Sequence, residues 1–184
     1  MGKVEDLAER FGRHLSVPLS TTGVAAERVL MVVYDKELER ALRERMTEFE
    51  ARAVTAGRAW SRIDCTRLFA EWLASLDYRE AYFEEPDHLG SKIEGEFRHL
   101  VVNRIREGLR GTDARSVTAV TGTASLYGFA RLSEVIRDVE PDVRGCLAVF
   151  FPGTKDQNNY RLLDARDGWN YLAHSISLHS EGDR

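Results

Sequence analysis

The chain has 184 residues, 43% of them hydrophobic and 30% charged, so it can bury one sizeable core and is expected to form a single domain over residues 1–184. Its 26 lysines and arginines against 30 aspartates and glutamates give a formal net charge of −4, which excludes a global basic field for nucleic acid or anionic membrane. The acidic start and the lack of an apolar run of about 18 residues argue against a secretory signal and a membrane span, so we expect a cytoplasmic protein.

The two cysteines agree with a reducing compartment. Cys65 and Cys146 are far apart in the chain and lie outside any Cys-x-x-Cys spacing. This gives little support to a disulfide framework or a thiolate metal site. We expect both residues to be small buried hydrophobes.

The first quarter of the chain predicts a helix, a strand and a second helix. Apolar residues recur at helical spacing over 4–15, and the β-branched run 28–34 is typical of a strand covered on both faces. Asp35 follows that strand directly and is placed to cap a helix. On this helix Glu39 and Arg43 are spaced i, i+4, which indicates a solvated face.

The middle of the chain continues this alternation. Segment 59–64 has the pattern of a half-buried or edge strand, and 65–76 returns to helical spacing. Segment 78–86 is aromatic and acidic and ends in proline, so we expect it to connect two helices over the surface. The longest predicted helix covers 89–109.

The last third adds further strands. We expect strands at 116–121 and 146–151, a helix at 126–139, and short elements at the sheet edge within 160–163 and 169–176. Strands that alternate with helices predict an α/β fold with a mostly parallel central sheet and helices on both faces. This three-layer, Rossmann-like arrangement lacks a Walker or dinucleotide-binding fingerprint.

Polar residues after the predicted strands define a candidate crevice. The carboxyl ends of parallel strands share one edge of a sheet, where open α/β folds bind ligands. The candidate crevice residues are Asp35, Asp64, Thr121, Gly122, Thr123 and Lys155. The commoner role of acids and small residues at such positions is to cap helices and form tight turns, so neither aspartate identifies a catalyst.

Motifs for established chemistry do not occur in this chain. Gly153 and Lys155 lack the upstream glycine and the spacing of a phosphate loop, and the histidines show no metal-ligand spacing. A nucleophile elbow of the form Gly-x-Ser-x-Gly is also missing. The sequence therefore predicts no catalytic residue, no metal site and no cofactor.

The block that follows the strand at 146–151 is the strongest candidate for a binding surface. We expect this strand to stop at Pro152-Gly153 and to open into a loop rich in amides, arginine and aromatic side chains, which suits a protein interface. The predicted partner-binding residues are Pro152, Gly153, Asn158, Asn159, Arg161, Trp169 and Tyr171. An Asx-rich turn held by Asp164, Arg166 and Asp167 is the alternative interpretation.

Several of these segments also resemble a known protein family. Phe-Phe-Pro-Gly at 150–153, Asn-Asn-Tyr-Arg-Leu-Leu at 158–163 and Asp-Gly-Trp-Asn-Tyr-Leu-Ala at 167–173 are similar to the BrxB family of bacterial BREX phage-defence systems. Thr121-Gly122, with Tyr127, Phe129 and Arg131 downstream, adds to the resemblance. Many members have Phe-Tyr-Pro-Gly followed by a glycine-containing polar stretch, so this chain departs from the family pattern in a way that suggests a distinct BREX subtype.

The resemblance implies a small cytoplasmic component of a machine that methylates host DNA and blocks phage replication. It implies an adaptor role without a known reaction, and a large phosphatase-like PglZ protein of the same system as the expected partner, with other BREX components as further partners. The oligomeric state stays open.

Two alternatives remain beside the adaptor hypothesis. The first is a nucleotide- or nucleic-acid-binding enzyme in which a divalent metal bridges Asp35 and Asp64, with Thr123 and Lys155 in the crevice. The second is direct DNA binding through a basic cluster near the end of the long helix, which equally suits a helix terminus with favourable dipole interactions. The residues of this cluster are Arg104, Arg106, Arg110 and Arg115.

Overall fold

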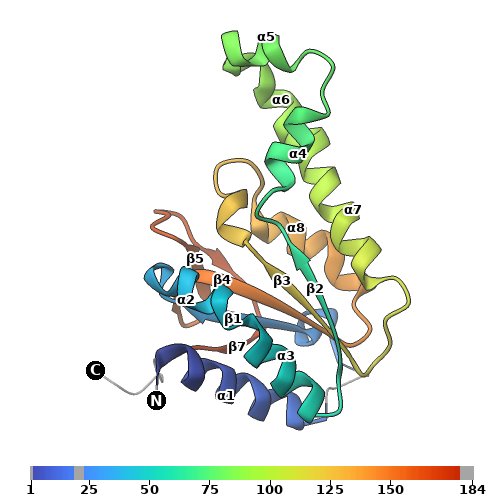
Figure 1. Cartoon of the computed structure of the whole chain (residues 1–184), viewed down its shortest axis with the longest axis vertical. Coiled ribbons are helices and arrows are strands. Elements are labelled where there is room, and N and C mark those ends of the chain that lie inside the picture. Colours follow the sequence, from blue (N-terminus) through green and yellow to red (C-terminus); the bar gives the residue numbers. More distant parts are fainter. Residues whose placement is uncertain (1, 19–22, 179–184) are drawn as a thin grey trace.

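The computed structural model describes residues 2–18 and 23–178 (Figure 1). Its central sheet has parallel neighbours in the spatial order β2-β3-β4-β1-β7, with helices on both faces. The predicted α/β fold with a mostly parallel sheet is therefore confirmed. The strands are β1 (Val29–Tyr34), β2 (Ala59–Asp64), β3 (Ser116–Thr121), β4 (Cys146–Asp156), β5 (Asn159–Leu162), β6 (Trp169–Asn170) and β7 (His174–Ile176).

One face of the sheet packs against α1 (Lys3–Ser16), α2 (Glu39–Glu44) and α3 (Met46–Thr55). Alternate side chains of β1, such as Val32, point to this face and share a core with Phe11 and Phe49. The helix expected after Asp35 is interrupted at Arg45, which leaves the helical conformation and forms an ion pair of 2.6 Å with Glu5 of α1.

The other face packs against α4 (Leu68–Ala74), α7 (Arg98–Leu109) and α8 (Leu132–Val139). Met31 and Val33 of β1 point to this side and join a second core with Ile105 and Val135. Coverage of both faces explains why the strand sequence is a continuous apolar run rather than an alternating one.

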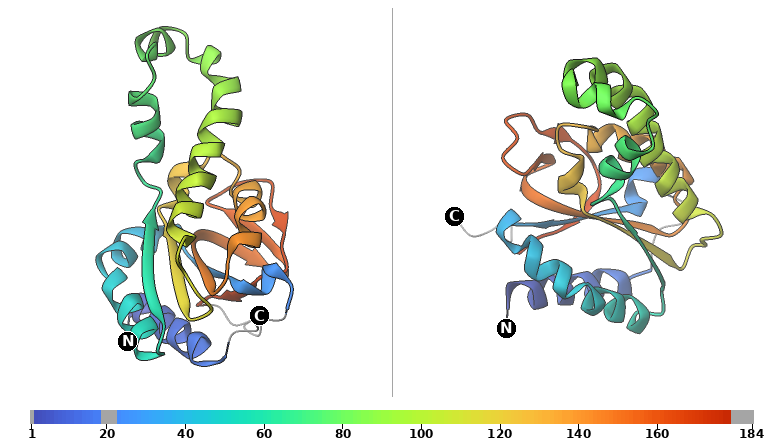
Figure 2. Two further views of the ribbon diagram at one scale, coloured as in Figure 1. Left: turned by 90° about the vertical axis from the view of Figure 1, so that its right-hand side faces the viewer. Right: turned by 45° about the horizontal axis from the view of Figure 1, so that its top comes forward.

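A helical arm projects from the sheet between β2 and β3 (Figure 2). It rises through α4, turns at α5 (Arg79–Glu84) and returns through α6 (Gly90–Lys92), a π-helical segment (Ile93–Phe97) and α7. Segment 78–86, which we expected to be a plain surface connection, therefore contains a short helix. Its proline starts a 3₁₀ turn, a position where the missing N–H costs nothing.

The prediction that the strand from 146 stops at Pro152-Gly153 is wrong. β4 runs to Asp156, because beyond its parallel partner β1 it forms an antiparallel hairpin with β5. Pro152 needs no N–H for this pairing and accepts a hydrogen bond from Leu163 N at 2.8 Å. Gly153 lets the strands approach, since a Cβ there would lie 2.0 Å from the Arg161 carbonyl oxygen.

Both cysteines are free and buried, as predicted. Burial raises the pKa of the Cys65 thiol and of the Cys146 thiol to about 12, so neither forms a thiolate near neutral pH. Across the part of the chain that the structure describes, no helix combines the length and the apolar character needed to cross a membrane.

Candidate functional site

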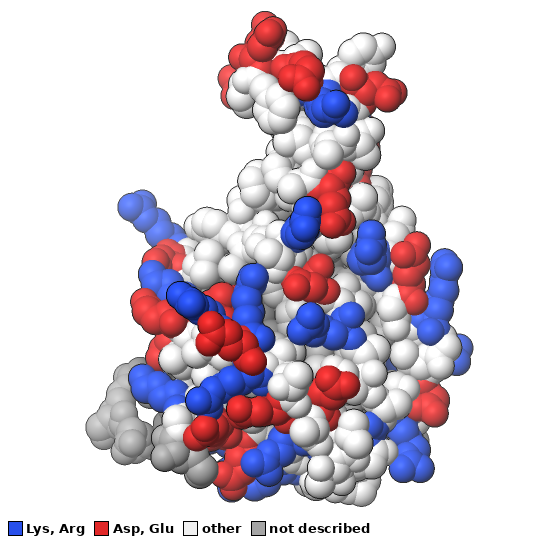
Figure 3. Space-filling model, in the orientation of Figure 1, with Lys and Arg blue, Asp and Glu red and all other residues white. Residues whose placement is uncertain are grey.

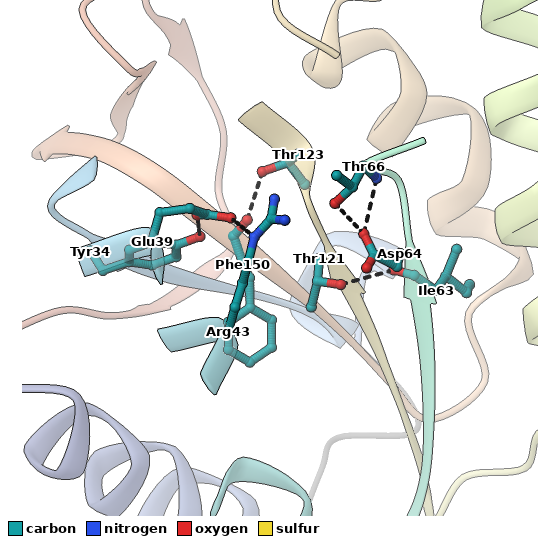
Figure 4. A network of polar contacts seen from close by, with 9 residues as sticks. All are labelled: Tyr34, Glu39, Arg43, Ile63, Asp64, Thr66, Thr121, Thr123 and Phe150. Carbon is teal, nitrogen blue, oxygen red and sulfur yellow. Dashed lines mark hydrogen bonds and ion pairs between the residues drawn. The ribbon is translucent and has the colours of Figure 1, made fainter. Parts of the chain in front are cut away.

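A network of polar contacts spans the edge where β1, β2 and β3 end (Figure 4). The register places Tyr34 beside Pro152 and Asp64 beside Thr121, so the strand ends meet as expected for parallel strands. The hydrogen bonds of this network join protein groups to each other, so these polar groups are engaged within the fold.

Asp64 is occupied by the turn that follows β2. Its Oδ1 accepts hydrogen bonds from Thr66 N at 2.9 Å and Thr66 Oγ1 at 2.5 Å. Burial alone would raise the pKa of Asp64, but these bonds and the charge of Arg43 outweigh it and hold the pKa below its ordinary value. Gly122 packs against this turn with φ +69°, and a Cβ there would lie 2.7 Å from Thr66 N. The turn-forming interpretation of Asp64 is confirmed.

Thr121, the last residue of β3, and Thr123, which follows it, also point into the protein. Thr123 Oγ1 donates to the Phe150 carbonyl oxygen at 2.7 Å in a buried position, and Thr121 Oγ1 donates to the Ile63 carbonyl oxygen at 3.4 Å. Both hydroxyls thus tie the end of β3 to the neighbouring strands.

Sequence reasoning missed the polar side chains that α2 brings over this edge. Glu39 accepts hydrogen bonds from Tyr34 Oη at 2.5 Å and from Arg43 Nε at 2.7 Å. The Arg43 guanidinium points between Thr123 and Asp64 in Figure 4. The i, i+4 spacing of Arg43 and Glu39 alone predicts a solvent-exposed helix face. The signal that these side chains lie over the sheet edge is that α2 starts only one short turn after β1.

The remaining predicted crevice residues lie apart from this network. The Asp35 carboxylate lies 4.0 Å from Lys3 Nζ, toward α1. Lys155 lies three residues beyond Pro152, about 10 Å along β4, with Nζ 5.9 Å from the centre of the Tyr160 ring. The structure therefore brings together four of the six predicted crevice residues: Asp64, Thr121, Gly122 and Thr123.

A second candidate site is an open groove of about 1130 Å³ beside this edge. Three segments far apart in the sequence line it: the returning limb of the arm from α6 to the start of α7, the segment from the end of β3 into α8, and the segment from β5 to β6. The second and third segments follow the ends of β3 and β5, whereas the first belongs to the long helical connection between β2 and β3. The lining residues are Gly90, Ile93, Glu94, Arg98, Tyr127–Glu134, Leu162, Ala165, Asp167, Gly168 and Trp169.

The groove combines aromatic and charged side chains. Phe129 stacks on Phe69 of the arm with ring centres 3.8 Å apart, and Tyr127 is 50% exposed. Glu134 pairs with Arg98 at 3.3 Å and with Arg131 at 3.7 Å. Because the Arg131 side chain is 83% exposed, a molecule bound in the groove can contact it directly.

The predicted partner-binding residues fall into two groups. Pro152 and Gly153 are buried in β4 and shape the hairpin with β5. Asn158 lies exposed at the turn, where its carbonyl oxygen accepts a hydrogen bond from Tyr171 N at 3.0 Å, while Asn159 is half-buried and Arg161 exposed. Only the exposed residues of this group are available to a partner.

The two predicted aromatic contact residues are half-buried within the protein. Trp169 lines the groove but also packs on the Phe151 and Tyr160 rings, with centres 5.6 Å and 5.9 Å away. Tyr171 Oη donates to Glu140 at 2.5 Å; burial and this bond raise the pKa of Tyr171 above its ordinary range. Both residues therefore support the hairpin as well as presenting surface.

All four arginines of the basic cluster near the end of α7 are exposed, and two of them contact other groups of the protein. Arg106 forms an ion pair of 2.8 Å with Asp142, and Arg115 Nη2 donates to the Gly57 carbonyl oxygen at 3.0 Å.

No protein-family model, curated protein or solved structure matches this chain. Within residues 2–18 and 23–178, no group of three or more histidine, cysteine, aspartate or glutamate side chains is placed to hold a metal ion. His179 lies outside the described residues.

Proposed function

We propose that this protein is an adaptor that binds a segment of a larger protein in the groove. The observation that carries this proposal is the convergence of three segments, far apart in the sequence, on one open groove with aromatic and arginine side chains. Aromatic residues and arginine are the side chains most enriched where protein interfaces are strongest. The volume of the groove suits a peptide segment or a short helix better than a single small ion.

The resemblance to the BrxB family supports a specific partner. Among the residues that carry the resemblance, Tyr127, Phe129 and Arg131 line one side of the groove, and Asp167, Gly168 and Trp169 line the other. The proposed partner is a PglZ-type protein of a BREX anti-phage system in the cytoplasm, with other BREX components as further contacts.

The test is co-purification of the tagged chain with the PglZ-type protein encoded in the same host. Replacing exposed groove residues, Tyr127→Ser with Arg131→Glu, should weaken the complex by about tenfold or more. The control is Val54→Ser with Arg137→Glu, an exposed pair outside the groove that repeats the charge reversal and replaces an exposed apolar side chain by serine. Trp169 is not used, because its loss would also remove packing from the hairpin.

Equal binding by the groove variant and its control would remove the groove from the interface. The exposed Arg161→Glu would then test the hairpin separately. Absence of any complex, with both proteins folded and expressed together, would overturn the adaptor proposal as a whole.

Arg43 favours a second candidate function, the binding of a nucleotide at the edge where the parallel strands end. Its guanidinium is partly exposed beside Asp64 and Thr123, and its Nη groups have no hydrogen-bond partner in the described residues. A nucleotide with magnesium at one hundred times its dissociation constant would stabilise the fold by about 2.7 kcal/mol. Unfolding curves that do not change with any nucleotide would reject this candidate.

A further inference from the structure

The tip of the helical arm, defined as residues 77–88, is a separate surface from the groove. Figures 1 and 2 show it far from the central sheet, at the turn between the two limbs of the arm. The limbs are held together below the tip by aromatic packing: the Phe97 ring is fully buried, with its centre 5.2 Å from that of Phe69 and 5.4 Å from that of Trp72. The arm therefore presents its tip on a packed support.

The helix at the tip has almost no contact with the core. None of the residues of α5 is buried, and only Tyr82 packs partly against the hydrophobic cluster below. Tyr78 and Phe83 are 76% and 61% exposed. A six-residue helix is far shorter than the roughly 12–15 residues that make an isolated helix even marginal in water, so α5 gains from a surface that covers it.

Acidic side chains gather at the tip (Figure 3), and the net charge of the tip equals that of the whole chain. The tip holds five acidic residues and one arginine, which gives a formal charge of −4; the other 172 residues hold 25 acidic and 25 basic residues and are neutral overall. At physiological ionic strength charges act over about 8 Å, so the tip carboxylates act as one local field. A partner that approaches the tip meets a negative field that the rest of the surface does not offer.

Two of the tip acids already have a partner within the tip. Glu80 lies 3.4 Å from Arg79, and Glu85 lies 3.0 Å from His88. The remaining acids, Asp77, Glu84 and Asp87, form no ion pair with any described residue.

We propose that the arm tip is a docking surface for a lysine- and arginine-rich segment of a partner protein. Cations complement the three unpaired carboxylates, and the exposed faces of Tyr78 and Phe83 bind guanidinium groups through cation–π contacts. A second copy of this chain is a poorer occupant, because its surface outside the tip has no excess of positive charge. This surface is independent of the groove.

The experiment is an affinity selection of random twelve-residue peptides against the purified full-length chain in about 150 mM salt. The enriched peptides should carry a clear excess of lysine and arginine. The double variant Glu84→Lys/Asp87→Lys should bind them at least about tenfold more weakly, and Phe83→Ser about fivefold more weakly. These positions are exposed, so the variants should melt within a few degrees of the parent protein.

The control for net charge is Glu50→Lys/Glu107→Lys, which makes the same charge change at exposed positions on α3 and α7. It should retain binding within about twofold, because it changes the net charge of the protein but leaves the tip unchanged. Three outcomes would each overturn the proposal. The enriched peptides could be neutral or acidic, the control variant could weaken binding as much as the tip variant, or only the groove variant Arg131→Glu could lose binding. Self-association that disappears in Phe83→Ser would instead assign the tip to a second copy.

Discussion

Replacing Phe97 by alanine tests whether the arm is a packed part of the protein. Phe97 is fully buried, and its ring meets those of Phe69, Trp72 and Phe129. Truncation of a buried phenylalanine costs about 3–5 kcal/mol, because transfer energy is lost and a cavity remains. Phe97→Leu keeps most of the volume and should cost less than about 1.5 kcal/mol.

Urea unfolding followed by tryptophan fluorescence measures this difference. With a typical dependence of about 1–3 kcal/mol per molar urea, Phe97→Ala should lower the midpoint by about 2 M, and Phe97→Leu by less than about 1 M. Phe83→Ala is the control, because Phe83 is exposed and its loss should change the free energy of unfolding by no more than about 0.5 kcal/mol. A cost below about 1 kcal/mol for Phe97→Ala would refute the packed base of the arm.

Three further predictions concern the sheet edge and the first helix. Thr123→Val should destabilise the fold by about 1–2 kcal/mol in thermal unfolding, because it leaves the Phe150 carbonyl oxygen buried without its partner, whereas Thr123→Ser should retain most of the stability. Gly122→Ala should cost more than about 1 kcal/mol in urea unfolding, because it combines φ +69° with a Cβ 2.7 Å from Thr66 N. Burial and a neighbouring histidine lower the pKa of His14 below its ordinary value of 6.5, so the unfolded chain takes up the proton first and stability should fall as the pH drops below 6.5. His14→Gln should reduce this slope between pH 7.5 and 5.5 if the reasoning holds.

The core of the fold was predictable because its strands are unusually simple in sequence. The runs at β1 and β3 are short, β-branched and buried on both faces, and this pattern identifies a central parallel strand. The extent of β4 was not predictable, because Pro152-Gly153 is typical of a strand end. The pairing of Gly153 with Leu162 of β5 extends β4 as a hairpin with a two-residue turn at Gln157-Asn158, and this turn lacks the Asn-Gly or Asp-Gly sequence that marks a hairpin.

The candidate site was predictable only in part. The strand ends converge as parallel topology requires, but a sequence does not show which hydroxyls point inward, as that of Thr123 does. Likewise, the spacing of Glu39 and Arg43 describes their pairing without showing that α2 places them over the sheet edge. The groove is assembled from segments at least 28 positions apart in the sequence, so only the fold reveals it.

The surface at the carboxyl ends of the strands can be described at two levels, the strand ends themselves and the segments that extend beyond them. At the first level, the Thr121 and Thr123 hydroxyls donate to backbone carbonyls and Asp64 accepts from Thr66, which holds the edge in place. At the second level, the segments that leave β2, β3 and β4 continue past the edge as the arm, the Tyr127–Arg131 segment and the hairpin, and these three form the groove. Because all three line the groove, a partner that fills it contacts all three at once. A partner that also reaches the arm tip would then be held at two separated surfaces, and the second contact would form at the high effective concentration set by the first.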